Sequence, residues 1–284
     1  MIQMCVKLIT LLIFSSILAI NIYADKEVNF IRVNFPPLWI TSGILQNKGI
    51  ADEGEKLIKN ELIEYSYNYL DVTVARAQVF MTKKSEEIYC AVPHGKGFFD
   101  NIIESKTWVT TSGHVLISNK KFIQRLKNNP RITNLKGQLI LKKFLKQTNS
   151  VGLITKAQRY PILDPLLKPY YLSKKIKAVV SSNMLNLYKM VLYNRADYTF
   201  QYESTVKYLQ QLNHDINFIT IEELNNYKVP IVVGCNNSPA SKGFIKKINK
   251  KIQKLRQIGL KKMKEFHSPI TYKNIKDFVS IEDE

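Results

Sequence analysis

The chain has 284 residues, of which 45% are apolar, and its 42 Lys and Arg against 23 Asp and Glu give a formal charge of +19. An apolar share of this size, with 15 Tyr and 13 Phe, excludes an intrinsically disordered chain and predicts a globular protein of one large or two medium domains. The lysines are spread along the whole sequence, so a biased residue composition explains the charge most simply, and an anionic ligand is the alternative.

The N-terminal segment indicates export. Lys7 precedes an apolar run over residues 8–20, and the small residue Ala24 follows it as a cleavage position, which together predict a secretory signal peptide over residues 1–24. The run is shorter than the roughly 20 residues that span a bilayer, although a retained anchor is the alternative. Cys5 precedes the run, whereas a lipid-modified cysteine would follow it. We therefore expect a free periplasmic protein with no stable membrane insertion and no nucleic-acid partner.

Beyond residue 25, short apolar or β-branched runs alternate with longer segments of helical period. This alternation is typical of strands covered by helices and predicts an α/β fold. Helices are predicted over residues 52–65, 183–193 and 242–266, where apolar residues recur on one side. The predicted strands cover residues 28–33, 71–75, 88–92, 115–118, 151–154, 176–181, 196–201, 216–219 and 231–235.

The last predicted helix, residues 242–266, has an apolar side that includes Phe244, Ile248 and Ile252 and an opposite side rich in lysine. A basic amphipathic helix of this kind can lie on a membrane surface. The same pattern arises when a terminal helix packs its apolar stripe on a domain and exposes its lysines, which is the interpretation we prefer.

Removal of the signal peptide would leave two cysteines, Cys90 and Cys235. An even pair in an oxidising compartment favours a disulfide over two free thiols. The four histidines are isolated along the sequence, so no zinc-type spacing is present and we predict neither a metal nor a cofactor.

Short motifs follow one another along the chain: a proline and aromatic segment at 35–39, a strand and helix with Arg76 at 73–80, a serine-aromatic motif at 105–108, a crossing strand at 113–118, a strand and helix start at 151–163, an Arg-x-Asp motif at 194–198 and a return strand at 229–236. Their order resembles that of the type 2 periplasmic substrate-binding proteins, the family-3 extracellular solute-binding group known for polar amino-acid uptake.

The resemblance implies two lobes, each a mixed sheet flanked by helices, joined by two hinge strands. Lobe one would comprise residues 25–115 and 228–284, and lobe two residues 116–227. The family fold would bring Cys90 and Cys235 together in lobe one, close to the hinge. Such proteins are monomers that close around a small-molecule solute and deliver it to an inner-membrane permease.

The resemblance also locates a ligand site and shows where this chain departs from the family. Amino-acid binders carry a carboxylate-clamping arginine shortly before the serine-aromatic motif, and here that stretch reads Lys96 to Phe99. The acid that holds the α-ammonium aligns with Tyr202, beside Glu203. Free amino acids are therefore disfavoured, and we expect an anionic or aromatic-containing solute. The expected ligand-binding residues are Trp39, Arg76, Lys96, Ser105, Trp108, Thr155, Gln158, Arg159 and Tyr202.

Other roles stay open. Trp39 and Ser105 suit structural caps, Arg76 suits a salt bridge, and Arg195 with Asp197 suits a fixed turn. A sensory or partner-binding protein of the same fold is the main functional alternative, and a derived dehydratase is a weaker one. No nucleophile elbow, phosphate loop or paired-His zinc motif is present in the sequence, so we assign no catalytic residue and expect no enzyme.

Overall fold

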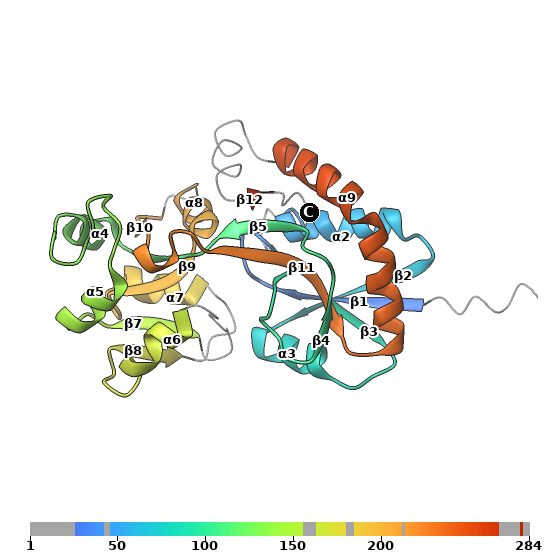
Figure 1. The fold of residues 1–284 in the computed structure, drawn as a ribbon, viewed down its shortest axis with the longest axis horizontal. Helices are drawn as coiled ribbons and strands as arrows, with labels where there is room; N and C mark the ends of the chain where they lie inside the picture. Colours follow the sequence, from blue (N-terminus) through green and yellow to red (C-terminus); the bar gives the residue numbers. More distant parts are fainter. Residues whose placement is uncertain are drawn as a thin grey trace, which may run out of the picture.

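The computed structural model describes residues 26–42, 46–155, 163–179, 185–211, 214–266 and 279–280. These residues form two lobes, each with its own sheet and flanking helices, so the predicted α/β two-lobed fold is confirmed (Figure 1). The predicted signal peptide over residues 1–24 lies outside the described residues.

Lobe one contains a seven-stranded sheet with the order β12-β5-β11-β3-β1-β2, and β4 also pairs with β11. Strands β1, β2 and β3 are mutually parallel, whereas β11 runs antiparallel to β3, β4 and β5. The strands are β1 (Lys26–Val33), β2 (Tyr65–Val72), β3 (Ile88–Gly95), β4 (Ile102–Glu104), β5 (Val109–Ser112), β11 (Lys228–Asn236) and β12 (Val279–Ser280).

Three helices cover the sheet of lobe one: α2 (Ile50–Glu61), α3 (Val74–Thr82) and α9 (Pro239–Phe266). Side chains alternate between the two faces of a strand, and Phe30 of β1 joins the core under α2 and α9 while Ile31 joins the core under α3. Phe244, Ile248 and Ile252 of α9 are buried in this core. The packing interpretation of the terminal helix is therefore the correct one for its first half.

Lobe two contains a five-stranded sheet with the order β10-β6-β9-β7-β8. Its larger core includes Phe144, Tyr198 and Phe200, and a second cluster lies on the other face. The elements are β6 (His114–Ser118), α4 (Lys120–Lys127), α5 (Leu141–Gln147), β7 (Gly152–Thr155), α6 (Leu163–Leu167), η1 (Lys168–Tyr170), β8 (Ile176–Val179), α7 (Leu185–Leu192), β9 (Tyr198–Tyr202), α8 (Glu203–Gln211), β10 (Asn217–Ile219) and η2 (Glu222–Leu224).

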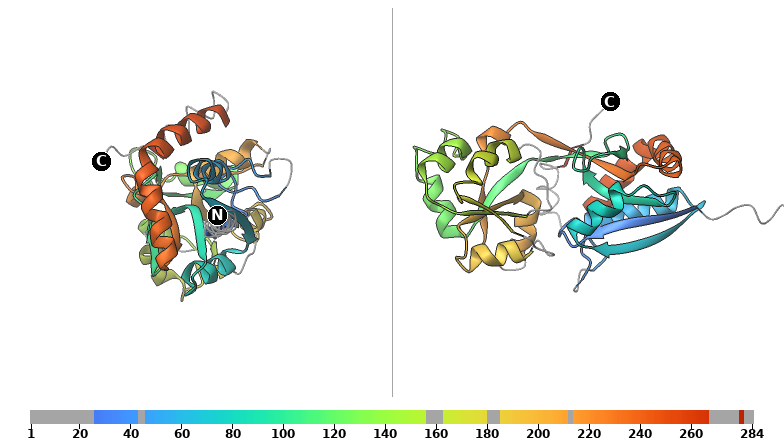
Figure 2. Two further views of the ribbon diagram at one scale, coloured as in Figure 1. Left: turned by 90° about the vertical axis from the view of Figure 1, so that its right-hand side faces the viewer. Right: turned by 90° about the horizontal axis from the view of Figure 1, so that it is seen from below.

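Within the described ranges, the chain crosses between the lobes twice, once where β5 passes through Gly113 into β6 and once where η2 leads into β11 (Figure 2). Both crossings are short; the first is extended through Gly113, whereas the second is a turn over residues 225–227. The lobe boundaries themselves, 25–115 with 228–284 and 116–227, stay a prediction.

One predicted strand and the end of one helix are wrong. The strand expected at 71–75 is β2, which begins at Tyr65, and Thr73 is instead the N-cap of α3, its hydroxyl accepting a hydrogen bond from the Arg76 N–H at 3.3 Å. The helix expected to reach residue 65 ends at Glu61. Tyr65 fits a helical spacing from Ile58 and Leu62. It is also the first of the tyrosines that alternate along the chain from this position, a pattern typical of a strand, and in the structure Tyr65 begins β2.

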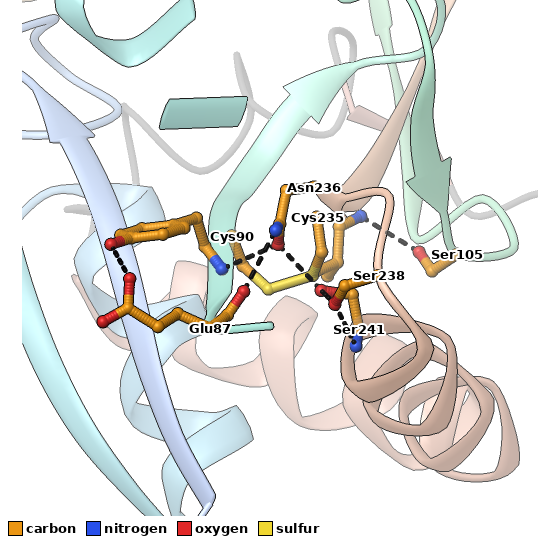
Figure 3. Close-up of a disulfide and its surroundings, with 9 residues drawn as sticks. Glu87, Cys90, Ser105, Cys235, Asn236, Ser238 and Ser241 are labelled. Atoms are coloured by element: carbon orange, nitrogen blue, oxygen red, sulfur yellow. Dashed lines mark hydrogen bonds between the residues drawn. A yellow bond between two sulfur atoms is a disulfide. The ribbon is translucent and has the colours of Figure 1, made fainter. Parts of the chain in front are cut away.

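The disulfide between Cys90 and Cys235 is confirmed, and the two residues face each other across β3 and β11. It lies in lobe one, as the resemblance implies, but near the end of β11 remote from Lys228 and therefore not close to the crossing. Next to it, the buried Asn236 amide accepts hydrogen bonds from the Tyr89 N–H at 2.9 Å and the Ser241 hydroxyl at 2.8 Å (Figure 3). The bridge and this amide together join β3, β11 and the start of α9.

Candidate functional site

The lobes touch through an aromatic pair at the carboxyl ends of their parallel strands. Phe35 lies two residues beyond β1, and its ring meets the ring of Tyr202, the last residue of β9, with centroids 6.4 Å apart in an edge-on arrangement. Phe35 also packs against the lobe-two cluster that contains Leu187 and Val191. Open α/β sheets bind ligands at the carboxyl ends of their strands, so this contact marks the candidate site.

A short loop over residues 34–40 presents Phe35. Phe35 and Trp39 form a backbone bridge, with hydrogen bonds of 3.0 Å from the Phe35 N–H to the Trp39 carbonyl and 3.2 Å in return. The Asp52 carboxylate accepts from the N–H groups of Gly49 at 2.7 Å and Ile40 at 3.3 Å. The loop is thus fixed on the first turn of α2.

Trp39 points away from lobe two and into lobe one. Its indole Nε1–H donates to Glu55 Oε1 at 3.0 Å, and Glu55 is only 1% exposed. Beside them, the buried Arg32 guanidinium lies 3.2 Å from Asp52 and 3.3 Å from Asp71. Burial raises the pKa of Glu55 to about 8, and its hydrogen bond from Trp39 and the charge of Arg32 oppose this only in part.

The raised pKa of Glu55 predicts a pH-dependent stability. The folded protein binds this proton more tightly than the unfolded chain, so the contribution is complete below the ordinary pKa of 4.5 and is lost as the pH rises to about 8. Glu55→Gln should therefore flatten the fall in unfolding free energy between pH 5 and pH 8, measured by urea denaturation. Glu53→Gln, on the more exposed side of α2, is the control and should leave the slope intact; an unchanged slope in Glu55→Gln would contradict the assignment.

On the lobe-two side, Tyr202 stacks on His114, with ring centroids 4.4 Å apart. The two residues face each other across β6 and β9. Burial lowers the pKa of His114 to about 3, so its imidazole is neutral at physiological pH. Thr155 ends β7, which is parallel to β9, and its side chain is buried at the same edge as Tyr202. Gln158 and Arg159 lie outside the described residues.

The remaining predicted residues belong to lobe one. Lys96 directly follows β3 and is exposed, with its backbone N–H bound to the Pro230 carbonyl at 2.8 Å. Arg76 is exposed on α3, and its guanidinium lies 5.3 Å from the centre of the Phe80 ring. Lys96 follows the carboxyl end of β3, and Arg76 lies in the first turn of α3, just after the carboxyl end of β2.

Ser105 and Trp108 make structural contacts inside lobe one. The Ser105 hydroxyl accepts from the Val233 N–H at 3.0 Å and donates to the Lys106 carbonyl at 2.8 Å, which fixes this segment on β11. The Trp108 ring packs so closely on α2 that a Cβ at Gly54 would approach it to 2.3 Å. The structure thus places Thr155 and Tyr202 at one edge of the lobe-two sheet, and Trp39, Ser105 and Trp108 within lobe one.

Sequence reasoning missed the pairing of Phe35 with Tyr202 and the buried Glu55. A signal for the acids was present, since Asp52 and Glu55 occupy the same stripe of α2 as the buried Ile58. Carboxylates on an apolar stripe are rarely buried without a partner, and this pattern alone could have marked them.

A cavity of about 540 Å³ lies elsewhere on lobe one, at the opposite edge of the sheet from the carboxyl ends of β1 and β3. It is lined by the end of α3, the segment before β3 and the start of α9, including Lys83 and Lys84. Among the residues that the structure describes, no helix has the length and apolar character needed to cross a bilayer. Within the same ranges, no group of three or more His, Cys, Asp or Glu is arranged to hold a metal ion.

No protein-family model matches the sequence, and no curated protein matches it. The fold, however, is similar to solved substrate-binding proteins. One is an amino-acid ABC transporter substrate-binding protein from Streptococcus pneumoniae bound to L-arginine, 12% identical, with 90% of this chain and 96% of that chain covered and a TM-score of 0.61. A second is an ancestral arginine-binding protein bound to glutamine, 13% identical, with 85% and 97% covered and a TM-score of 0.62.

A third is an ABC uptake transporter substrate-binding protein from Streptococcus pneumoniae with bound histidine, 14% identical, with 86% of this chain and 92% of that chain covered and a TM-score of 0.60. The identities are low, but the similarity of fold extends over most of each chain. The chain therefore has the two-lobed fold of the type 2 periplasmic binding proteins.

Proposed function

We propose that this protein is an exported solute-binding protein that closes its two lobes around a small molecule and delivers it to an inner-membrane transporter. The observation that carries the proposal is the contact of Phe35 with Tyr202. It joins the two lobes at the carboxyl ends of the parallel strands of their sheets. Two lobes joined by short segments can rotate about them and bury a ligand between facing strand ends. No bond is made or broken in this role.

The solute that fits best carries a carboxylate. The similar proteins are named for arginine, glutamine and histidine as bound molecules, which gives no support to a solute that is only anionic or aromatic and puts amino acids first. In this chain Lys96 offers an exposed ammonium at the edge of lobe one, and Phe35 and Tyr202 offer ring faces for the remainder of the molecule. Glu203 opens α8 directly after Tyr202 and would suit an amino group.

A thermal-shift screen of the mature protein tests the proposal. Arginine, histidine, glutamine, aromatic acids and dicarboxylates are compared, and a solute at a hundredfold excess over its Kd should stabilise the fold by about 2.7 kcal/mol. Lys96→Gln should weaken a carboxylate solute about tenfold by isothermal titration, because a charged hydrogen bond is lost. Lys84→Gln, at the remote cavity, is the matched control and should bind normally.

Three results are informative. Equal weakening by the two lysine variants would show a general charge effect and remove Lys96 from the site. Stabilisation by dicarboxylates but by no amino acid would favour the anionic solute expected from the sequence. If none of these solutes stabilises the protein, the proposed function is wrong.

A further inference from the structure

Two aromatic side chains of one loop face in opposite directions. In the loop over residues 34–40, Phe35 contacts lobe two and Trp39 contacts Glu55 inside lobe one. The backbone bridge between Phe35 and Trp39 ties the two residues together through a tight turn. A displacement of the Trp39 indole is therefore transmitted to the Phe35 ring.

The partner of Trp39 is a buried acid. One oxygen of the Glu55 carboxyl accepts the indole N–H, and the other, fully buried, has no hydrogen-bond partner among the residues that the structure describes. The neighbouring cation, Arg32, already lies between Asp52 and Asp71. A carboxylate anion buried in this way costs several kcal/mol, whereas a neutral carboxyl group avoids most of that cost.

We propose that Glu55 is a positioning residue for solute capture: by holding Trp39, its carboxyl group sets the loop over residues 34–40 so that Phe35 meets Tyr202 and the two lobes close. The inference rests on the proposed function, because closure has a purpose only if a solute is captured. Glu55 itself lies in lobe one and acts through the loop, without touching the solute.

A pH dependence of closure follows from the surroundings of Glu55. Arg32 of β1 favours its charged form, whereas Asp52 of α2 and Asp71 of β2 oppose it, as does burial. The pKa of Tyr69 of β2 is raised by burial and, in second place, by the charge of Glu55. When Glu55 ionises on the alkaline side of neutrality, its anion draws water or a cation into the buried cluster around it. The loop over residues 34–40 is then no longer held in one position.

The first test needs no solute. The chain has two tryptophans, so Trp108→Phe leaves Trp39 as the single indole, and its emission is followed from about pH 6 to pH 9.5. A 4-fluorophenylalanine at position 35 reports the contact with Tyr202 by fluorine NMR. Both signals should change with one midpoint near the alkaline transition of Glu55. Glu55→Gln keeps an acceptor for the indole and cannot ionise, so it should abolish both changes, whereas Glu53→Gln should keep them.

If Trp108→Phe fails to fold, the fluorine signal at position 35 in the otherwise unchanged chain carries the same test. A transition that persists in Glu55→Gln overturns the inference. So does a Trp39 transition that Glu55→Gln abolishes while the Phe35 signal stays constant, since the loop would then not transmit the change.

The second test uses the solute found in the thermal-shift screen. Its affinity should fall about tenfold from pH 6.5 to pH 9.5 in the parent protein and in Glu53→Gln, and should stay constant in Glu55→Gln. A solute that binds equally well at both values in the parent overturns the inference and leaves the proposed function intact. The absence of any binding solute overturns the proposed function, and the solute-free signals then decide alone whether Glu55 controls the loop.

Discussion

Replacing both bridged cysteines, Cys90→Ala with Cys235→Ala, is expected to lower the free energy of unfolding by about 2–5 kcal/mol. The bond joins residues 145 positions apart, and the loop that it closes contains all of the lobe-two sheet. In the loop-entropy account, a bond that closes so long a segment restricts the unfolded chain strongly. The loss of unfolding free energy on removing the disulfide is therefore expected in the upper part of that range. Urea denaturation of the exported protein without reductant measures the loss.

Reduced wild-type protein is the matched control, and it should unfold at the same urea concentration as the double variant. Solute affinity should stay within about twofold of wild type, because the bond lies at the other end of β11 from the crossing and far along β3 from its carboxyl end. Equal stability of the oxidised and reduced wild type would refute the prediction.

Arg32→Met is expected to cost about 3–5 kcal/mol at neutral pH. The substitution keeps much of the side-chain volume but removes the guanidinium that faces both Asp52 and Asp71, and it leaves the buried Asp52 carboxylate without the charge that lies 3.2 Å from it. Burial already raises the pKa of Asp52, with Arg32 opposing that rise. The loss should therefore shrink in acid, where Asp52 becomes neutral.

A double variant separates this effect from simple packing. Arg32→Met with Asp52→Asn should recover part of the lost stability, because no buried anion remains. Lys56→Met removes an exposed cation that pairs with Glu53 at the surface and should cost less than about 1 kcal/mol. If Arg32→Met and Lys56→Met unfold at the same urea concentration, Arg32 does not compensate a buried charge.

Much of the fold could be predicted from the sequence because it depends on period and order. The buried strands β3, β6 and β11 read as continuous apolar runs, and the cysteine pair falls in two of them. The start of β2 could not be placed, because Tyr65 satisfies a helical and an alternating pattern at once, and the parallel pairing of β2 with β1 decides between them.

The site was harder to predict for a physical reason. Hydropathy and motif order place Trp39 and Trp108 near the expected cleft, but only packing shows that one indole binds Glu55 and the other covers Gly54. The same packing turns Phe35, an unremarked member of the proline and aromatic segment, toward Tyr202. The direction in which a side chain on a short loop points depends on contacts with residues distant in the sequence. These contacts cannot be read from a single sequence.

The order of the strands along the chain has a consequence for how the protein matures. The sheet of lobe two is built from one continuous stretch, whereas the sheet of lobe one needs β11 to be inserted between β3 and β5, and β11 is made after all of lobe two. If the chain becomes available for folding from its N-terminus onward, lobe two can fold before lobe one is complete. During that time Cys90 remains a free thiol, because Cys235 follows later in the chain. Until that partner arrives, the half-built lobe one exposes an open strand edge and a reactive sulfur together, which makes it the stage at which folding most needs protection.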